Sequence, residues 1–109
     1  MTTERIAALN DDLRRNIWFP GKNKVVLTAG LASDQKLAAD AIAAVRAYDD
    51  FTTDSDPHGE HDMGFLEVRG TKIMWKIDYY DNDLTWHSPD PAAPLVTIRV
   101  LTIMLASEY

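Results

Sequence analysis

Apolar residues recur at helical spacing in two stretches of the first half of the chain. Positions 6, 9, 13 and 17 are apolar and Pro20-Gly21 follows, so we expect an amphipathic helix that ends before this pair. A second helix is expected up to Tyr48, with Ser33 or Asp34 as its cap and an alanine-rich apolar face. Between the two helices, residues 24–30 include several β-branched side chains and predict a short strand.

Alternation of apolar and polar residues dominates the second half of the chain. Residues 64–68 and 72–80 predict the two strands of a hairpin, with a tight turn at Arg69-Gly70-Thr71. A turn at 81–83 and a third strand at 84–87 complete an antiparallel meander. The stretch from 49 to 62, which contains six carboxylates, a proline and a glycine, predicts a long loop.

The last apolar stretch, residues 95–105, is hydrophobic on nearly all sides when it is drawn as a helix. Pro91 and Pro94 precede it and fit the first turn of a helix, where no amide hydrogen is required. We therefore expect a C-terminal helix with Leu101 and Leu105 in the core. The expected fold is α+β in the order α-β-α-β-β-β-α, with a three- or four-stranded, mainly antiparallel sheet (a β-meander) packed against helices.

Length and composition predict a single soluble domain over residues 1–109. The hydrophobic share of 46% and the charged share of 26% are ordinary for a globular protein and exclude disorder throughout. The chain has no cysteine, which excludes disulfides, thiolate metal sites and cysteine nucleophiles. No apolar run approaches the roughly 20 residues of a membrane span, and no signal peptide is visible. We therefore expect a cytoplasmic protein that does not bind a membrane.

Negative charge is concentrated in the second part of the chain. The net charge of −6 divides into +2 for residues 1–48 and −8 for residues 49–109. Segments 49–62 and 78–90 contain carboxylates but no lysine or arginine. Such a surface repels phosphate backbones, so we expect no direct binding to nucleic acid, but it attracts a basic protein surface. The candidate partner-binding residues are Asp54, Asp56, Glu60, Asp81, Asp83, Tyr80 and Trp86.

Histidine and aspartate residues offer an alternative, chemical role. His61 beside Asp62, with Asp78 and His87 on the predicted strands, is a set suited to general acid–base catalysis. His58, His61 and His87 are also the imidazoles from which a transition-metal site would be built, although no ligand signature is present. The structural alternative is that these residues bond loop amides and fix the turns. Without GxSxG, Walker or GxGxxG motifs, we expect no cofactor and no resident metal.

Five motifs stand out along the chain: Asp49-Asp50-Phe51-Thr52, Gly59-Glu60-His61-Asp62-x-Gly64, Trp75-Lys76-Ile77-Asp78-Tyr79-Tyr80-Asp81, His87-Ser88-Pro89-Asp90-Pro91 and the run from Arg99 to Ala106. Together they resemble a bacterial family catalogued as domain of unknown function 3768, and the resemblance covers nearly the whole chain from residue 10 onward. His61 matches the family pattern, whereas His58 stands where an aromatic residue is expected. The family has no established activity, and the resemblance implies an origin on plasmids, phages or integrated elements.

Small acidic proteins from such elements are often inhibitors of host defence that occupy nucleic-acid-binding surfaces. We therefore expect a non-enzymatic, acidic interaction protein, specifically an inhibitor of a host nucleic-acid-handling system of the anti-CRISPR or antirestriction type, which acts as a DNA mimic. The alternative is a small enzyme or a metal-binding protein that uses His61, Asp62, Asp78 and His87. Convergence of both histidines with Asp62 or Asp78 in one pocket would favour this alternative.

Overall fold

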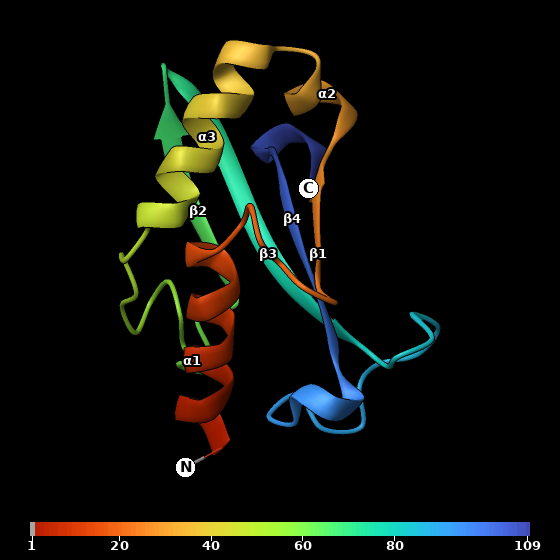
Figure 1. Cartoon of the computed structure of the whole chain (residues 1–109). Coiled ribbons are helices and arrows are strands. Elements are labelled where there is room, and N and C mark those ends of the chain that lie inside the picture. Colours follow the sequence, from red (N-terminus) through yellow and green to blue (C-terminus); the bar gives the residue numbers. More distant parts are fainter. Residues whose placement is uncertain (1) are drawn as a thin grey trace.

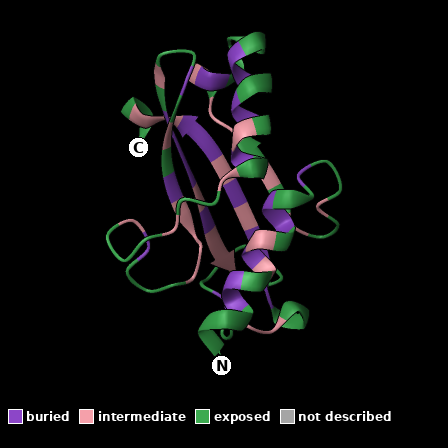
Figure 2. Ribbon diagram, turned by 90° about the vertical axis from the view of Figure 1, so that its left-hand side faces the viewer, coloured by how far each residue is buried: buried purple, intermediate pink, exposed green. Residues whose placement is uncertain are grey.

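The computed structural model describes residues 2–109 and shows a four-stranded sheet with the two long helices on one of its faces (Figures 1 and 2). The strand order is β1-β4-β3-β2. Three helical segments of a turn or so complete the fold, none of which spans more than four residues. In chain order the elements are α1 (Thr2–Arg15), β1 (Lys24–Leu27), α2 (Ala29–Ala32), α3 (Gln35–Ala47), β2 (Met63–Val68), β3 (Thr71–Tyr80), η1 (Pro94–Val96), β4 (Ile98–Leu105) and η2 (Ala106–Glu108).

The α+β class and the four-stranded sheet confirm the sequence prediction, but the sheet is mixed. β2 pairs antiparallel with β3, and β3 pairs antiparallel with β4, whereas β1 runs parallel to β4. The β2–β3 turn consists of Arg69 and Gly70, whose φ angles of 53° and 77° suit the tight turn of a two-residue hairpin. Asp34 caps α3 as predicted, because its carboxylate accepts a hydrogen bond from the Leu37 N–H at 3.1 Å.

The predicted C-terminal helix is wrong: residues 98–105 form the strand β4. This strand lies between β1 and β3, so both of its edges are hydrogen-bonded to other strands, and its residues Leu101 and Ile103 are buried in the core. The apolar run is short, and the periodicity of a short apolar run does not distinguish a strand from a buried helix. Leu101 is fully buried, as expected, whereas Leu105 near the end of β4 is only partly buried.

The predicted third strand at 84–87 is also wrong, and the predicted element order α-β-α-β-β-β-α is therefore incorrect. Only one isolated bridge, between Tyr80 and His87, continues the ladder beyond β3. The Asp81 carboxylate accepts hydrogen bonds from the N–H groups of Asp83 and Thr85, which winds this segment into a turn. The turn places Leu84 at a φ of 58°, outside the extended region that a strand requires.

The core lies between the helices and the face of the sheet that they cover. Alternate residues of β3, namely Ile73, Trp75 and Ile77, point toward the helices and are buried, as the period of two predicted. Neither α1 nor α3 lies on the opposite face of the sheet (Figures 1 and 2). None of the helices within residues 2–109 has the length and the apolar content that a membrane crossing requires.

Candidate functional site

Both acidic segments, 49–62 and 78–90, are attached to the last residues of β3, at the end of the sheet that we call the acidic end; in Figure 1 the loop 49–62 lies beside α1 on the left and the segment that follows β3 lies on the right. Segment 49–62 directly precedes β2. Segment 78–90 comprises the last three residues of β3 and the ten residues that follow them. Two backbone hydrogen bonds fix the segments to β3: the Ile77 N–H donates to the Asp62 carbonyl at 2.8 Å, and the Ser88 N–H donates to the Tyr79 carbonyl at 3.0 Å. These bonds bring Asp62 and Ser88 to neighbouring residues of β3, while the rest of the two segments extends to opposite sides of the sheet (Figure 1).

His61 anchors the acidic loop 49–62 to α1. Its Nδ1 lies 2.9 Å from a carboxylate oxygen of Asp11, and its ring stacks on Phe51 with centroids 3.9 Å apart. Its backbone N–H donates to the carboxylate of Asp56, which is 8% exposed. His61 adopts a φ of 56°, which is unusual for a residue with a side chain, so these contacts hold a turn that the backbone alone disfavours.

Arg14 extends this anchor into the core. The guanidinium is buried between the rings of Phe51 and Trp75, 5.3 Å from each centroid. It donates to the carbonyls of Val45 and Tyr48 at the end of α3, and it pairs with Asp11 at 2.8 Å. One side chain of α1 thus joins α3, the sheet and the loop.

A second buried network connects α1 with the ends of β3 and β4. The Asn10 amide donates to the Tyr79 hydroxyl at 2.8 Å and to the Glu60 carbonyl at 3.0 Å, and its oxygen accepts from Arg99 at 2.7 Å. The Tyr79 hydroxyl in turn donates to the Glu60 carboxylate at 3.1 Å. Burial raises the pKa of the Tyr79 phenol well above its usual value, so this hydroxyl remains a proton donor.

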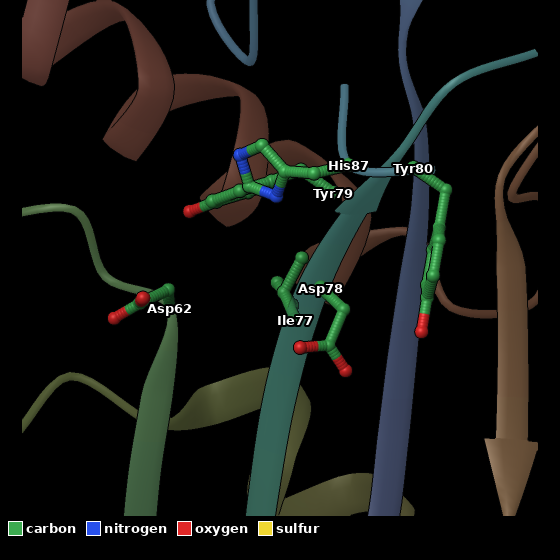
Figure 3. A pocket seen from close by; sticks show the side chains of 6 residues that line it. All are labelled: Asp62, Ile77, Asp78, Tyr79, Tyr80 and His87. Atoms are coloured by element: carbon green, nitrogen blue, oxygen red, sulfur yellow. The ribbon is translucent and has the colours of Figure 1, made fainter. Parts of the chain in front are cut away.

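A pocket of about 320 Å³ lies between the two acidic segments, at the edge of β3 that β2 leaves uncovered (Figure 3). Asp62, which directly precedes β2, and Asp78 of β3 belong to its lining, together with three aromatic side chains. We call this site the edge pocket; its lining residues are Asp62, Ile77, Asp78, Tyr79, Tyr80 and His87.

The two carboxylates of the edge pocket have different surroundings. Asp78 forms an ion pair with Lys76, whereas Asp62 pairs with no lysine or arginine within residues 2–109. Burial raises the pKa of the Asp62 carboxyl, and the negative charge of Glu60 raises it further. The surroundings of Asp62 therefore destabilise the ionised form of its carboxyl group.

The predicted partner-binding residues divide into exposed and structural ones. Asp54, Asp83 and Trp86 are exposed, and no hydrogen bond or ion pair holds the carboxylates of these two aspartates within residues 2–109. Three of the predicted carboxylates serve the fold: Asp56 binds the His61 N–H, Glu60 accepts from Tyr79, and Asp81 organises its turn. Tyr80 is half-buried and lines the edge pocket.

The alternative catalytic set does not gather as a whole. Asp62, Asp78 and His87 line the edge pocket, but His61 does not, because its imidazole contacts Asp11 and Asp56 instead. His87 is exposed, and its ring meets that of Tyr79 edge to face at 6.2 Å. Within residues 2–109, no group of three or more histidine, aspartate or glutamate side chains is arranged to hold a metal ion.

Sequence reasoning missed the partners that α1 and β4 supply, namely Asn10, Asp11, Arg14 and Arg99. A signal was present for two of them, because Asn10 and Arg14 lie beside Ile6 and Leu13 on the buried side of α1. A polar residue on an apolar helical stripe indicates a buried hydrogen-bonding group. Arg99 gave a similar signal as the one charged residue in the apolar run 95–105.

Comparison with known proteins identifies the family and nothing beyond it. The family model described as "Protein of unknown function (DUF3768)" matches residues 2–108, essentially the whole chain, so the chain belongs to this family. The resemblance inferred from the sequence motifs is therefore confirmed. Neither the curated proteins nor the solved structures contain a match to the chain.

Proposed function

We propose that this protein is a non-enzymatic interaction protein whose acidic end binds the basic, nucleic-acid-binding surface of a partner protein. The observation that carries the proposal is that two acidic segments, 49–62 and 78–90, are both attached to the last residues of β3. Both segments lack lysine and arginine, so no cation of their own neutralises them. A concentrated negative field of this kind steers a basic surface toward itself and repels nucleic acid.

Two exposed carboxylates of the acidic end are available for such a partner. Asp54 and Asp83 are exposed, one in each acidic segment, and their carboxylates form no bond within residues 2–109. Binding a cation therefore breaks no interaction of the folded chain at these positions. Exposed carboxylates spaced over two loops offer lysine and arginine residues the kind of negative charge that a phosphate backbone offers.

In its specific form, the proposed function is inhibition. A protein that occupies a nucleic-acid-binding surface excludes nucleic acid from it, and the partner then loses its activity. We propose that the partner is a host nucleic-acid-handling defence complex, of the CRISPR or restriction type, and that the gene for this protein belongs to a mobile element. The acidic composition of residues 49–109 supports this form of the proposal.

A pair of double variants tests the proposal. Asp54→Asn/Asp83→Asn removes two negative charges from the acidic end, whereas Asp40→Asn/Glu67→Gln removes two near the β2–β3 turn at the opposite end of the sheet. Both variants have the same net charge, and both change exposed side chains, so folding is expected to persist. We expect the wild type and the control variant to capture the same protein from a host lysate, and the acidic-end variant to capture much less of it.

The captured protein then decides the mechanism. Double-stranded DNA should compete with this protein for the partner, and affinity should fall steeply as salt rises. Capture that is equal for the two double variants, or that DNA does not displace, would contradict the proposal. Turnover of a substrate by this chain that depends on Asp62 and His87 would instead support the enzymatic alternative.

A further inference from the structure

We propose that two copies of this protein associate through the free edge of β1, which joins their two sheets into one continuous sheet. This contact surface is additional to the acidic end and has a different partner, another copy of the same chain. Three features of β1 point to it: unbonded backbone groups, exposed apolar side chains, and charges that are complementary between two copies.

The backbone of β1 has hydrogen-bonding groups to spare. β1 is the end strand of the sheet, and β4 pairs with only one of its edges (Figure 1). The Thr28 N–H donates to the Ile103 carbonyl of β4 at 3.1 Å. Since successive residues of a strand direct their N–H and C=O groups to opposite edges, those of Val25 and Leu27 point away from β4. No hydrogen bond within residues 2–109 reaches these groups, so they can pair with another strand.

An antiparallel copy of β1 satisfies all of these groups in one register. Val25 of each copy then forms a hydrogen-bonded pair with Leu27 of the other copy, about a two-fold axis. The axis passes between the two Val26 residues, which lie directly opposite each other. Val25 and Leu27 pack against the core, so Val26 lies on the opposite face of the sheet, where it is 44% exposed. In the pair, each Val26 side chain packs against its counterpart.

Apolar surface lies beside the same edge. Val25 and Leu27 are only partly buried, and they line a hollow of about 320 Å³ together with residues of α3 and of the loop that follows α1. In this loop, Trp18 and Phe19 are 62% and 85% exposed. The register above brings Val25 and Leu27 of the second copy next to this hollow, on the same face of the sheet. Burial of this apolar surface favours association beyond what the backbone bonds contribute.

Charge complementarity favours a second copy as the occupant. Lys24 is exposed and pairs with no carboxylate within residues 2–109, and Glu108 pairs with no lysine or arginine of the same range. The Glu108 carboxylate accepts a hydrogen bond from the Thr28 hydroxyl at 2.7 Å. In the proposed register Lys24 lies opposite Thr28 of the second copy, so its long side chain reaches the Glu108 carboxylate of that copy. The two-fold axis repeats this ion pair, and each copy supplies the charge that the other lacks.

The antiparallel arrangement also keeps the two acidic ends apart. β1 runs parallel to β4, and β4 begins beside the last residues of β3, to which the acidic segments are attached. The acidic end therefore lies near the start of β1, and an antiparallel pair places the two acidic ends at opposite ends of the joined sheet. A parallel contact would place them side by side, although each chain has a net charge of −6.

Sedimentation equilibrium measures the association at protein concentrations from about 1 μM to about 1 mM, the range suited to a small interface. We expect the mean mass of the wild type to rise from that of one chain toward twice that value. Hydrogen exchange gives a second readout that needs no variant. The amides of Val25 and Leu27 should exchange more slowly at the highest concentration than at the lowest, because their N–H groups are bonded only in the pair.

A first pair of variants locates the contact. Val26→Lys places two positive charges directly opposite each other and should weaken association by about tenfold or more. Phe65→Lys is its control, because Phe65 is a 56% exposed apolar residue of β2 at the other edge of the sheet, and the substitution adds the same charge. Its association should remain within about twofold of the wild type. Both positions are exposed, and the circular dichroism spectrum of each variant verifies its fold.

A second pair of variants tests the ion pair. Lys24→Glu turns two attractive contacts between the copies into repulsive ones, so association should weaken by about tenfold. Lys72→Glu changes the net charge equally, at an exposed position of β3, and should weaken association by about twofold or less.

Two results with the wild type would overturn the proposal: the mass of a single chain at every concentration, or unchanged exchange of the Val25 and Leu27 amides in the associated protein. Association that Phe65→Lys abolishes and Val26→Lys does not would place the contact on β2 instead. The proposed function is tested separately, because Val26→Lys leaves both acidic segments intact and should capture as much partner protein as the wild type does.

Discussion

Arg14→Met is expected to destabilise the protein strongly, because the guanidinium of Arg14 connects three parts of the fold. It donates to the carbonyls of Val45 and Tyr48 at the C-terminal end of α3, and it pairs with Asp11 on α1. Methionine keeps most of the side-chain volume but offers no donor and no charge. The variant therefore tests the polar contacts rather than the packing.

The magnitude follows from what the substitution leaves behind. Removing one partner of a buried ion pair costs about 3–5 kcal/mol, since the other charge loses its compensation. Asp11 is 16% exposed and keeps its bond to His61, which places the expected loss toward the lower end, at about 3 kcal/mol. A domain of this size is stable by about 5–15 kcal/mol, so the variant should remain folded but lose a large part of its stability.

Urea unfolding followed by circular dichroism measures this loss. Arg15→Met is the matched control, because Arg15 is the next residue of α1, is 65% exposed and lies 4.0 Å from the same Asp11 carboxylate. Its effect should stay within about 0.5 kcal/mol. Asp11→Asn, alone and combined with Arg14→Met, should show a coupling of about 1 kcal/mol or more. A loss below about 1 kcal/mol for Arg14→Met would refute the reasoning.

Three further predictions concern other parts of the fold. Gly64→Ala should cost about 1–3 kcal/mol in urea unfolding, since a Cβ there would lie 2.5 Å from Trp75 Nε1 and 2.6 Å from Tyr48 Cζ; a neutral effect would mean that these rings move aside easily. Glu108→Gln should speed hydrogen exchange of residues 105–109 at neutral pH, because the Glu108 carboxylate accepts bonds from Thr28 and from two backbone N–H groups. These bonds lower the pKa of the carboxyl, so the difference between the variant and the wild type should fade in acid. A difference that does not depend on pH would contradict this explanation. Asp62→Asn should raise the melting temperature at pH 7, because the raised pKa of the Asp62 carboxyl means that its ionised form destabilises the folded state. This gain should shrink as the pH falls toward 3.8, the ordinary pKa of an aspartate. A lower melting temperature of the variant at pH 7 would be the contrary result.

Local pattern was sufficient for much of the fold. Apolar residues at positions 6, 13 and 17 marked the buried side of α1, the alternation from Ile73 onward marked the core face of β3, and Arg69-Gly70 marked the hairpin. In each case the signal is contained within one element, because the spacing of side chains follows from the geometry of a single helix or strand. The predicted α+β class was right for the same reason.

The C-terminal strand could not be predicted from the local sequence pattern, because residues distant in the chain set its environment. β4 is a central strand because β1 pairs with one of its edges and β3 with the other, and β1 lies more than seventy residues earlier in the chain. Composition still carried a signal, because Ile98, Val100, Thr102 and Ile103 are β-branched and favour a strand over a helix. The periodicity of a short apolar run alone does not decide between the two.

The candidate site could be predicted only in part, since half of its contacts come from other elements. The residues of segment 49–62 drew attention as a dense group of carboxylates and imidazoles, and the chain does place Asp62 in a pocket with Asp78 and His87. The partner of His61 is Asp11, which stands fifty positions away and belongs to a helix with no obvious relation to the loop. Only the packing of α1 beside the loop brings these two side chains together.

The anchoring contacts bear directly on how the acidic end would function. A loop of fourteen residues rich in charge would ordinarily be mobile, and a partner would have to order it at an entropic cost. Here the loop is fixed from three sides, because His61 binds Asp11, Phe51 stacks between His61 and the guanidinium of Arg14, and Glu60 joins Tyr79 of β3. The carboxylates at its surface are therefore held in place before any partner arrives. Preorganisation of this kind lowers the cost of binding, so the buried polar residues of α1 would support the proposed interaction by holding the loop that carries the exposed carboxylates.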